Sequence, residues 1–359
     1  MKNQTWAYLL GALITFQGCI EQIESPFKAG SIQRNLVVDG KIVPGSGPFS
    51  VKLQQIADFA RDSLLAVEDA RVFILDEESN IFEYTYQGEG VYEIPQYTLQ
   101  AEVGKSYSLQ IHWQDRSYHS LEETIPPLVS IDSIYLEFSQ EAVQRIPPNP
   151  NPLNVINIFV DTEIPSLPQG PYLRWEASED FVLHEFLPPG SLKIPRACYY
   201  NWAINPQQIK LLDGDQVGSR RWEKNLIGTK EVDWTFYFKH YFNVVQYSTS
   251  KASIEYWQKV DQVINQVGSI FDIPPAGIQG NIFREDKREE LVLGYFEATA
   301  TDTAHYLIFR EDFPYAVEIE GLCPSFFYYW LFEPPLHPAC CQCDYFGGAS
   351  LTKPYYWED

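Results

Sequence analysis

Cys19 is the residue of this sequence whose chemistry follows most directly from its neighbours. It comes after a basic start at Lys2, an apolar run over residues 6–16, and the small residue Gly18. This order predicts a bacterial secretory signal that ends in a lipoprotein box, where the cysteine thiol and its new amine receive acyl chains. Several acyl chains hold a protein stably on a membrane. We therefore predict a signal peptide over residues 1–18 and lipid attachment at Cys19.

The cysteines that remain after Cys19 carry the rest of the covalent chemistry. They are Cys198, Cys323, Cys340, Cys341 and Cys343. An exported protein meets an oxidising compartment, where cysteines form disulfides by default. We predict two disulfides among Cys198, Cys323, Cys340 and Cys343, and four cysteines allow three pairings. Cys341 is the predicted free thiol, because its two neighbours flank it at CxxC spacing.

The same cysteine cluster has a second interpretation as a zinc site. Cys323 or His337 would then supply a further ligand beside Cys340 and Cys343. Zinc ribbons normally use two separated CxxC pairs, whereas this chain has one, so the compartment and the spacing both favour disulfides.

No catalytic constellation stands out among the remaining residues. A Gly-x-Ser-x-Gly elbow, a His-Glu-x-x-His motif and a phosphate-binding glycine loop are all absent from the sequence. His184 and His305 are isolated histidines, for which core or surface positions are more common than catalysis. Carboxylates are so numerous that an acidic pair, as in glycosidases, carries no specificity. We predict no catalytic residue, no metal and no cofactor.

The charge balance restricts the partners of the chain. Acidic residues outnumber basic ones by 48 to 26, which gives a formal net charge of −22. Such a surface repels phosphate backbones, so we predict no nucleic-acid binding. Anionic lipid headgroups repel it too, so the acyl chains on Cys19 must provide the attachment to the membrane.

The composition and the spacing of apolar residues predict a mainly β protein. Aromatic residues make up 15% of the chain and favour strands, while 25 prolines interrupt long helices. Residues 19–34 are polar and are predicted to tether the lipid to the first strand. Residues 35–126 contain short alternating segments, which predict a β-sandwich. In the clearest of them, Tyr107, Leu109, Ile111 and Trp113 share one face.

A larger β-rich domain is predicted over residues 127–359, after a stiff connector at Pro126-Pro127. Its one predicted helix covers residues 251–267, with Ser250 as N-cap and Gly268 as C-cap. One apolar stripe of this helix should pack on the second β domain; it consists of Ile254, Trp257, Val260, Ile264 and Val267.

Several segments together resemble a known family. They are Leu36–Gly40, Ile131–Tyr135, Tyr256–Ile282, Val292–Phe296, Cys340–Cys343, Gly347-Gly348 and Lys353–Trp357. Over nearly the whole mature chain they are similar to the lipoprotein family called domain of unknown function 4249. The Gly-Asn-Ile and Gly-Tyr-Phe elements, which begin at Gly280 and Gly294, are the most specific parts.

This resemblance implies an outer-membrane lipoprotein with an Ig-like or transthyretin-like N-terminal sandwich. Genes of the family commonly lie beside those of TonB-dependent receptors, and the family supplies no catalytic residue. Its CxxC corresponds to Cys340 and Cys343. Cys341 departs from the family pattern, which supports it as the free thiol.

We therefore expect a non-enzymatic outer-membrane lipoprotein that is accessory to a TonB-dependent receptor or transporter, through ligand capture or partner docking. Two alternatives stay open, a lipid-anchored secreted hydrolase acting on glycans or peptides and a structural envelope or adhesion protein. The sequence names no ligand and leaves open whether the protein faces the periplasm or the outside.

Aromatic residues near the C-terminus are the predicted partner contact. Tyr355, Tyr356 and Trp357 stand almost at the end of the chain, where termini are usually exposed. Pro354 and the nearby cysteines could instead fold this tail back onto the body. Residues 326–332 are a second candidate, but their almost wholly apolar run favours a place in the core.

Overall fold

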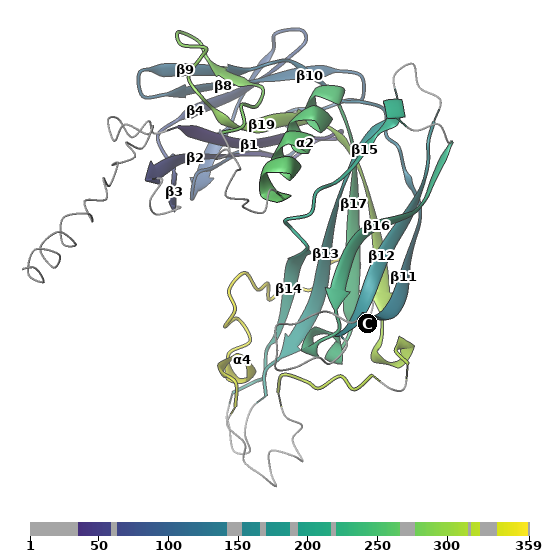
Figure 1. The fold of residues 1–359 in the computed structure, drawn as a ribbon. Helices are drawn as coiled ribbons and strands as arrows, with labels where there is room; N and C mark the ends of the chain where they lie inside the picture. Colours follow the sequence, from purple (N-terminus) through teal and green to yellow (C-terminus); the bar gives the residue numbers. More distant parts are fainter. Residues whose placement is uncertain are drawn as a thin grey trace, which may run out of the picture.

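The computed structural model describes residues 35–58, 63–141, 153–165, 170–186, 193–216, 220–265, 277–314, 317–323 and 336–357. Cys19, the predicted signal and tether, and residues 326–332 lie outside this part of the chain. The fold is mainly β, with several sheets stacked as sandwiches, as the sequence predicts. In Figure 1 one sandwich lies above the other, and the helix α2 stands beside their junction. No helix among the described residues is long and apolar enough to cross a membrane.

The first sandwich consists of two six-stranded sheets around one core. One sheet contains β1 (Leu36–Ile42), β2 (Phe49–Asp58), β3 (Ser63–Ala66), β6 (Thr85–Gly88), β7 (Val91–Ile94) and β19 (Leu293–Ala298). The other contains β4 (Arg71–Asp76), β5 (Ile81–Glu83), β8 (Ser106–Trp113), β9 (Arg116–Ser120), β10 (Glu123–Thr124) and β18 (Ile282–Arg284). In β8 the predicted alternation holds, because Tyr107, Leu109, Ile111 and Trp113 are all buried.

Two strands of this first sandwich come from far along the chain. β19 pairs in parallel with β1, and β18 pairs antiparallel with β9. The predicted domain boundary at residue 126 is therefore incomplete, because β18 and β19 follow it in the sequence but belong to the first sandwich. Gly294 permits the parallel pairing, because it has a φ of 88° and a Cβ there would lie 1.8 Å from the Val38 carbonyl oxygen.

The second sandwich packs a three-stranded sheet on a larger one. The smaller sheet contains β11 (Ile131–Glu141), β12 (Leu153–Glu163) and β16 (Arg221–Glu231). The larger has the order β14-β13-β17-β20, with β15 also paired to β13. These strands are β13 (Tyr172–His184), β14 (Ala197–Ile204), β15 (Lys210–Asp213), β17 (His240–Thr249) and β20 (Ala300–Ile308). Short 3-10 turns follow at η1 (Gly214–Gln216), η2 (Trp234–Tyr237) and η3 (Arg310–Asp312).

The predicted helix is present as α2 (Lys251–Asn265), and a single turn, α4 (Pro338–Cys341), lies near the C-terminus. The Ser250 hydroxyl accepts a hydrogen bond from Ser253 N (3.1 Å), as expected of an N-cap. The last predicted helical residues and Gly268 lie outside the described residues. Within the predicted stripe Ile254 is buried, whereas Ile264 is exposed. The apolar stripe is therefore buried at the start of α2 and exposed near its end.

Candidate functional site

The outer face of the β14-β13-β17-β20 sheet is the strongest candidate for a binding site. Along β13 the side chains alternate, so that Trp175 and Ala177 join the core between the two sheets of the second sandwich. Glu176, Ser178 and Asp180 belong to the opposite face. A cavity of about 650 Å³ lies over that face. Its walls are the second half of α2, residues 205–209 between β14 and β15, and Tyr356 of the C-terminal tail.

A buried carboxylate, Asp180, organises the polar end of this cavity. Asn201 Nδ2 donates to Asp180 Oδ1 (2.6 Å), and Asn243 Nδ2 donates to Asp180 Oδ2 (2.8 Å). The Tyr356 hydroxyl also donates to Asp180, which ties the tail to the sheet. Ser178 Oγ accepts a further hydrogen bond from Asn201 Nδ2 (3.0 Å). The amide hydrogens of both asparagines are thus directed into the protein.

His305 continues this network from the neighbouring strand β20. Its Nδ1 lies 2.6 Å from Asn243 Oδ1. Because Asn243 Nδ2 already donates to a carboxylate, its Oδ1 must accept, so the proton of neutral His305 is on Nδ1. Burial holds the pKa of His305 below its ordinary value. The ring stacks on Tyr356 at 3.8 Å between centroids. Nε2 of His305 therefore remains as an acceptor.

The other end of the cavity is formed by Arg174, of which only 3% is exposed. Its guanidinium lies between the rings of Tyr247 (4.1 Å) and Trp257 (4.5 Å). Its Nη2 pairs with Glu297 (3.1 Å), and its Nη1 pairs with Glu176. Burial opposes ionisation of Glu176, but the charge of Arg174 leaves the pKa of this carboxyl below its ordinary value. The charges at this end are therefore already compensated.

A second polar region, which we call the junction cluster, joins the two sandwiches; it consists of Glu123, Arg174, Thr249, Ser250, Ser253, Asn281, Tyr295 and Glu297. The buried Glu297 of β19 accepts from Thr249 Oγ1 (2.8 Å) and Ser253 Oγ (2.6 Å) besides Arg174. Burial acts against its ionisation, yet Arg174 lowers the pKa of Glu297 below the ordinary value. This carboxylate thus links the first sandwich to β13, β17 and α2.

Glu123 of β10 holds the other half of the junction cluster without a cationic partner among the described residues. Its carboxyl accepts from Ser250 Oγ (2.8 Å), Asn281 Nδ2 (3.3 Å) and the Tyr295 hydroxyl. Burial raises the pKa of Glu123, because these neutral donors offset only part of the desolvation. Asn281 Nδ2 also donates to Phe296 O (2.8 Å), and Asn281 Oδ1 accepts from Phe296 N (2.9 Å). The side chain of Asn281 thus makes the two hydrogen bonds that a neighbouring strand would otherwise make.

The cysteines lie at the far end of the second sandwich. Disulfides join Cys198 to Cys343 and Cys323 to Cys340, while Cys341 is free and exposed. Cys323, Cys340 and Cys343 of the alternative zinc site are therefore all in disulfides. His337 Nδ1 instead accepts from Ala339 N (3.2 Å) at the start of α4. Among the described residues no group of three or more His, Cys, Asp or Glu could hold a metal.

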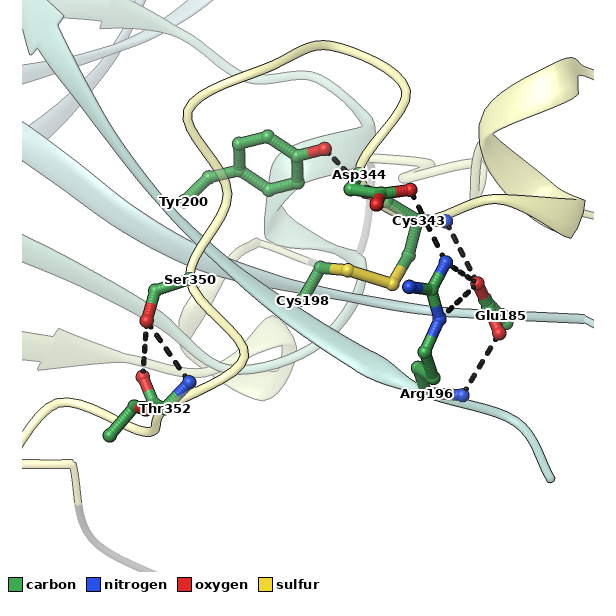
Figure 2. The surroundings of a disulfide bond; sticks show 8 residues. All are labelled: Glu185, Arg196, Cys198, Tyr200, Cys343, Asp344, Ser350 and Thr352. Atoms are coloured by element: carbon green, nitrogen blue, oxygen red, sulfur yellow. Dashed lines mark hydrogen bonds and ion pairs between the residues drawn. A yellow bond between two sulfur atoms is a disulfide. The ribbon is translucent and has the colours of Figure 1, made fainter.

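An ion pair between the exposed Arg196 and the buried Glu185 stands beside the Cys198–Cys343 disulfide. Figure 2 shows the Arg196 guanidinium between Glu185 (2.6 Å) and Asp344 (3.2 Å). Cys343 N donates to Glu185 Oε1 (3.2 Å). Burial disfavours the charged form of Glu185, but the hydrogen bonds from Arg196 and Cys343 bring its pKa below the ordinary value. These contacts fix the start of the tail that later walls the cavity.

The tail returns to the body and separates the three aromatic residues of the predicted partner contact. Ser350 forms a two-bond bridge with Tyr199 on the edge of β14 (2.8 Å each). Trp357 is only 7% exposed and packs on Tyr199 and Tyr241. Tyr356 walls the cavity, and Tyr355 is 94% exposed. Of the three residues, only Tyr355 is thus available in full to a partner.

A family model described as domain of unknown function 4249 (DUF4249) matches residues 22–305. The chain belongs to this family. The match extends from before β1 into β20 and so includes most of both sandwiches of the DUF4249 chain. No curated protein matches the chain.

The Gly-Asn-Ile and Gly-Tyr-Phe elements, which begin at Gly280 and Gly294, lie at the junction of this DUF4249 protein. Gly280 fits tightly there, since a Cβ on it would lie 1.7 Å from the Gly294 carbonyl oxygen. Asn281 and Tyr295 both bond Glu123. These residues connect the returning strands to the first sandwich and so have a structural role.

Sequence reasoning missed the cavity of this DUF4249 chain. In the sequence His305 is an isolated histidine, and Asp180, Asn201 and Asn243 belong to no recognisable motif. The useful signal was the alternation in β13, where Arg174, Glu176, Ser178 and Asp180 occupy every second position. A polar row on a strand otherwise rich in apolar residues indicates that one sheet face does not belong to the core.

Proposed function

We propose that this chain is a non-enzymatic outer-membrane lipoprotein that captures a ligand for a TonB-dependent β-barrel receptor or transporter. The observation that supports it most is the cavity on the outer face of the second sandwich. The cavity combines aromatic walls with a few convergent polar groups, which is the usual composition of ligand pockets. The polar groups are held in place by buried hydrogen bonds, so the site needs little reorganisation to bind.

The proposed lipid at Cys19 gives the second argument. A tether of residues 19–34 would confine the protein to a membrane plane, which raises its effective concentration near other membrane proteins. A capture protein gains most from this confinement, because the released ligand meets the receptor in the same plane. The acidic surface keeps the body of the protein from binding anionic lipid nonspecifically.

Tyr355 is the proposed contact with the receptor. It is 94% exposed and neighbours Tyr356 on the cavity wall. A receptor that covers Tyr355 would therefore stand next to the cavity, where it could accept the ligand. Exposed aromatic residues are enriched at the centres of protein interfaces.

A mild-detergent pull-down from the native membrane tests the partner. We expect a TonB-dependent barrel to co-purify with the wild-type protein and to be weakened by Tyr355→Ala. Tyr97→Ala is the matched control, because Tyr97 is 81% exposed but lies on the first sandwich. Equal loss with both variants would remove Tyr355 as the contact. A wild-type protein that brings down no barrel and instead turns over a glycan or peptide would establish the hydrolase alternative.

The anchor has its own test. Cys19→Ala should release the protein from the detergent phase or mislocalise it, and the wild-type protein should carry the mass of its acyl chains. If the Cys19→Ala protein stays with membranes as before, and the wild-type protein has no added lipid mass, the lipoprotein proposal is wrong.

A further inference from the structure

We propose that the cavity binds a neutral ligand rich in hydroxyl groups, of the chemistry of an oligosaccharide. The inference deepens the proposed function, because it names the ligand class for the same site. It stands on three features of the cavity: the compensation of its charges, the acceptors that its polar groups leave open, and its apolar walls.

The charged groups around the cavity favour an uncharged ligand. Arg174 is enclosed between two rings and already pairs with Glu176 and Glu297. Both oxygens of Glu176 are used, one by Arg174 and the other by the Tyr247 hydroxyl (2.7 Å). An anionic ligand would meet a guanidinium that is already paired with two carboxylates and whose one unpartnered group, Nε, is buried. It would also meet a protein of formal net charge −22. A cationic ligand would have to compete with Arg174 for Glu176. The other nearby carboxylate, Asp180, does not line the cavity and already accepts hydrogen bonds from Asn201, Asn243 and Tyr356.

The hydrogen bonds at the polar end favour a ligand that supplies donors. The amide hydrogens of Asn201 and Asn243 are directed at Asp180 and Ser178. Asn201 Oδ1 and His305 Nε2 have no hydrogen-bond partner among the described residues, and both are acceptors. Hydroxyl groups satisfy such acceptors directly, whereas carboxylates and phosphates bring no proton to them. The acceptors are therefore matched by a sugar rather than by an anion.

The remaining walls offer apolar contact of the kind that sugar rings use. Trp257, Val260 and Ile264 line the cavity from α2, and Tyr356 lines it from the tail. Aromatic side chains present a large apolar surface with a polar edge, which suits a ring that has CH groups on its faces and hydroxyls on its rim. The volume of about 650 Å³ lies within the common range for small-ligand sites.

Isothermal titration calorimetry with tetrasaccharides of one length tests the ligand class. The neutral probes are maltotetraose, cellotetraose, mannotetraose, xylotetraose and laminaritetraose; tetragalacturonate is the anionic counterpart and chitosan tetramer the cationic one. We expect at least one neutral probe to bind, and both charged probes to bind at least about tenfold more weakly. Tighter binding of either charged probe, or no binding of any neutral one, would overturn the inference.

Two variants place the binding in the cavity. Asn201→Ala and Trp257→Leu should each weaken the best neutral probe by about tenfold. Asn201 is exposed, so its replacement keeps the fold even if Trp257→Leu does not. Gln87→Ala is the matched amide control, since Gln87 is exposed on β6 of the first sandwich. Unchanged affinity of the Asn201→Ala protein would contradict the proposed site.

The outcome is separable from that of the receptor pull-down. If a barrel co-purifies but no neutral tetrasaccharide binds, the proposed accessory function is supported and the proposed ligand class is wrong. If a saccharide binds but no barrel co-purifies, the proposed ligand class is supported and the proposed partner is wrong.

Discussion

The junction cluster and the polar end of the cavity are built from similar side chains but differ in what they leave open. At the junction, Glu297 receives donors from three side chains of the protein, and Asn281 bonds both main-chain groups of Phe296. In the cavity, the donors of Asn201 and Asn243 are used, while acceptors of Asn201 and His305 stay open. A network whose carboxylates and amide are bonded within the protein serves the fold, whereas a network that leaves acceptors open toward a cavity can serve a ligand.

The largest effect should follow from removal of the carboxylate at the centre of the junction. Glu297→Ala leaves part of the Arg174 charge buried without its partner, so we expect a loss of about 3–5 kcal/mol in the free energy of unfolding. Chemical denaturation measures it. The control Glu83→Ala breaks an exposed pair with Arg71 and should cost less than about 1 kcal/mol. Similar losses for the two variants would contradict the structural role of the junction.

Removal of the Cys198–Cys343 disulfide should come next and should reach the cavity as well. The bond closes a sequence separation of 145 residues, and the double variant Cys198→Ala/Cys343→Ala should lose about 2–5 kcal/mol. Because this bond holds the start of the tail, the Tyr356 wall should loosen and ligand affinity should fall. Cys341→Ser is the control and should change neither quantity, since Cys341 is free and exposed.

The same cysteines give a count that is independent of stability. Alkylation without reduction should label one thiol in each mature chain, at Cys341, and reduction should expose the four paired cysteines. Mass spectrometry of the alkylated peptides measures this. Labelling at Cys198 or Cys323 before reduction would contradict the pairing.

Asn281→Ala should cost about 1–3 kcal/mol, because it leaves the buried N–H and C=O of Phe296 without partners and removes a hydrogen-bond donor to Glu123. Asn201→Ala should change the free energy of unfolding by less, since Asn201 is exposed. Thermal and chemical unfolding of the two variants compare the regions directly. An Asn201→Ala protein that is less stable than Asn281→Ala would reverse the assignment of the two networks.

The free energy of unfolding at acidic pH should depend on Glu297 of the junction cluster. The folded pKa of Glu297 lies below its ordinary value of 4.5, so its contribution is complete above about pH 4.5 and is lost as the pH falls through the folded pKa. The deficit of Glu297→Gln relative to wild type should therefore be full at neutral pH and should narrow below about pH 4.5. Unfolding at a series of pH values measures it. A deficit that grows on acidification would contradict the sign.

The smallest pH effect should be found in the cavity. The pKa of His305 lies below its ordinary value of 6.5, so its Nε2 stays an acceptor at neutral pH. Affinity for the best neutral tetrasaccharide should be flat from about pH 6.5 to 8 and should fall only when acid places a proton on the ring. Calorimetry across this range and below it measures the effect, and an affinity that rises on acidification would show that His305 acts as a donor.

Local sequence signals predicted the elements but not their long-range partners. The alternation of Tyr107 to Trp113 and the cap at Ser250 depend on neighbours in the chain, and the structure contains both features. The return of β19 to β1 joins residues such as Val37 and Leu293, which no local pattern connects. The sequence therefore indicated a sandwich without its last two strands.

The cavity could not be predicted from the sequence for a related reason. Asp180, Asn201, Asn243 and His305 lie on four different strands, β13, β14, β17 and β20, which become neighbours only through the sheet register. Tyr356 joins them from the far end of the chain. The sequence shows its aromatic character, but its position depends on a disulfide and on the bridge at Tyr199, neither of which has a local signal.

Hydrogen exchange followed by mass spectrometry tests the difference between the two regions most directly. The wild-type protein is compared with and without the neutral tetrasaccharide that binds best in calorimetry. We predict slower exchange in the cavity segments 201–209, 257–264 and 303–305, and unchanged exchange in the junction segments 281–284 and 293–298. Protection of the junction segments with no change around the cavity would contradict the assignment of the outer face as the binding site.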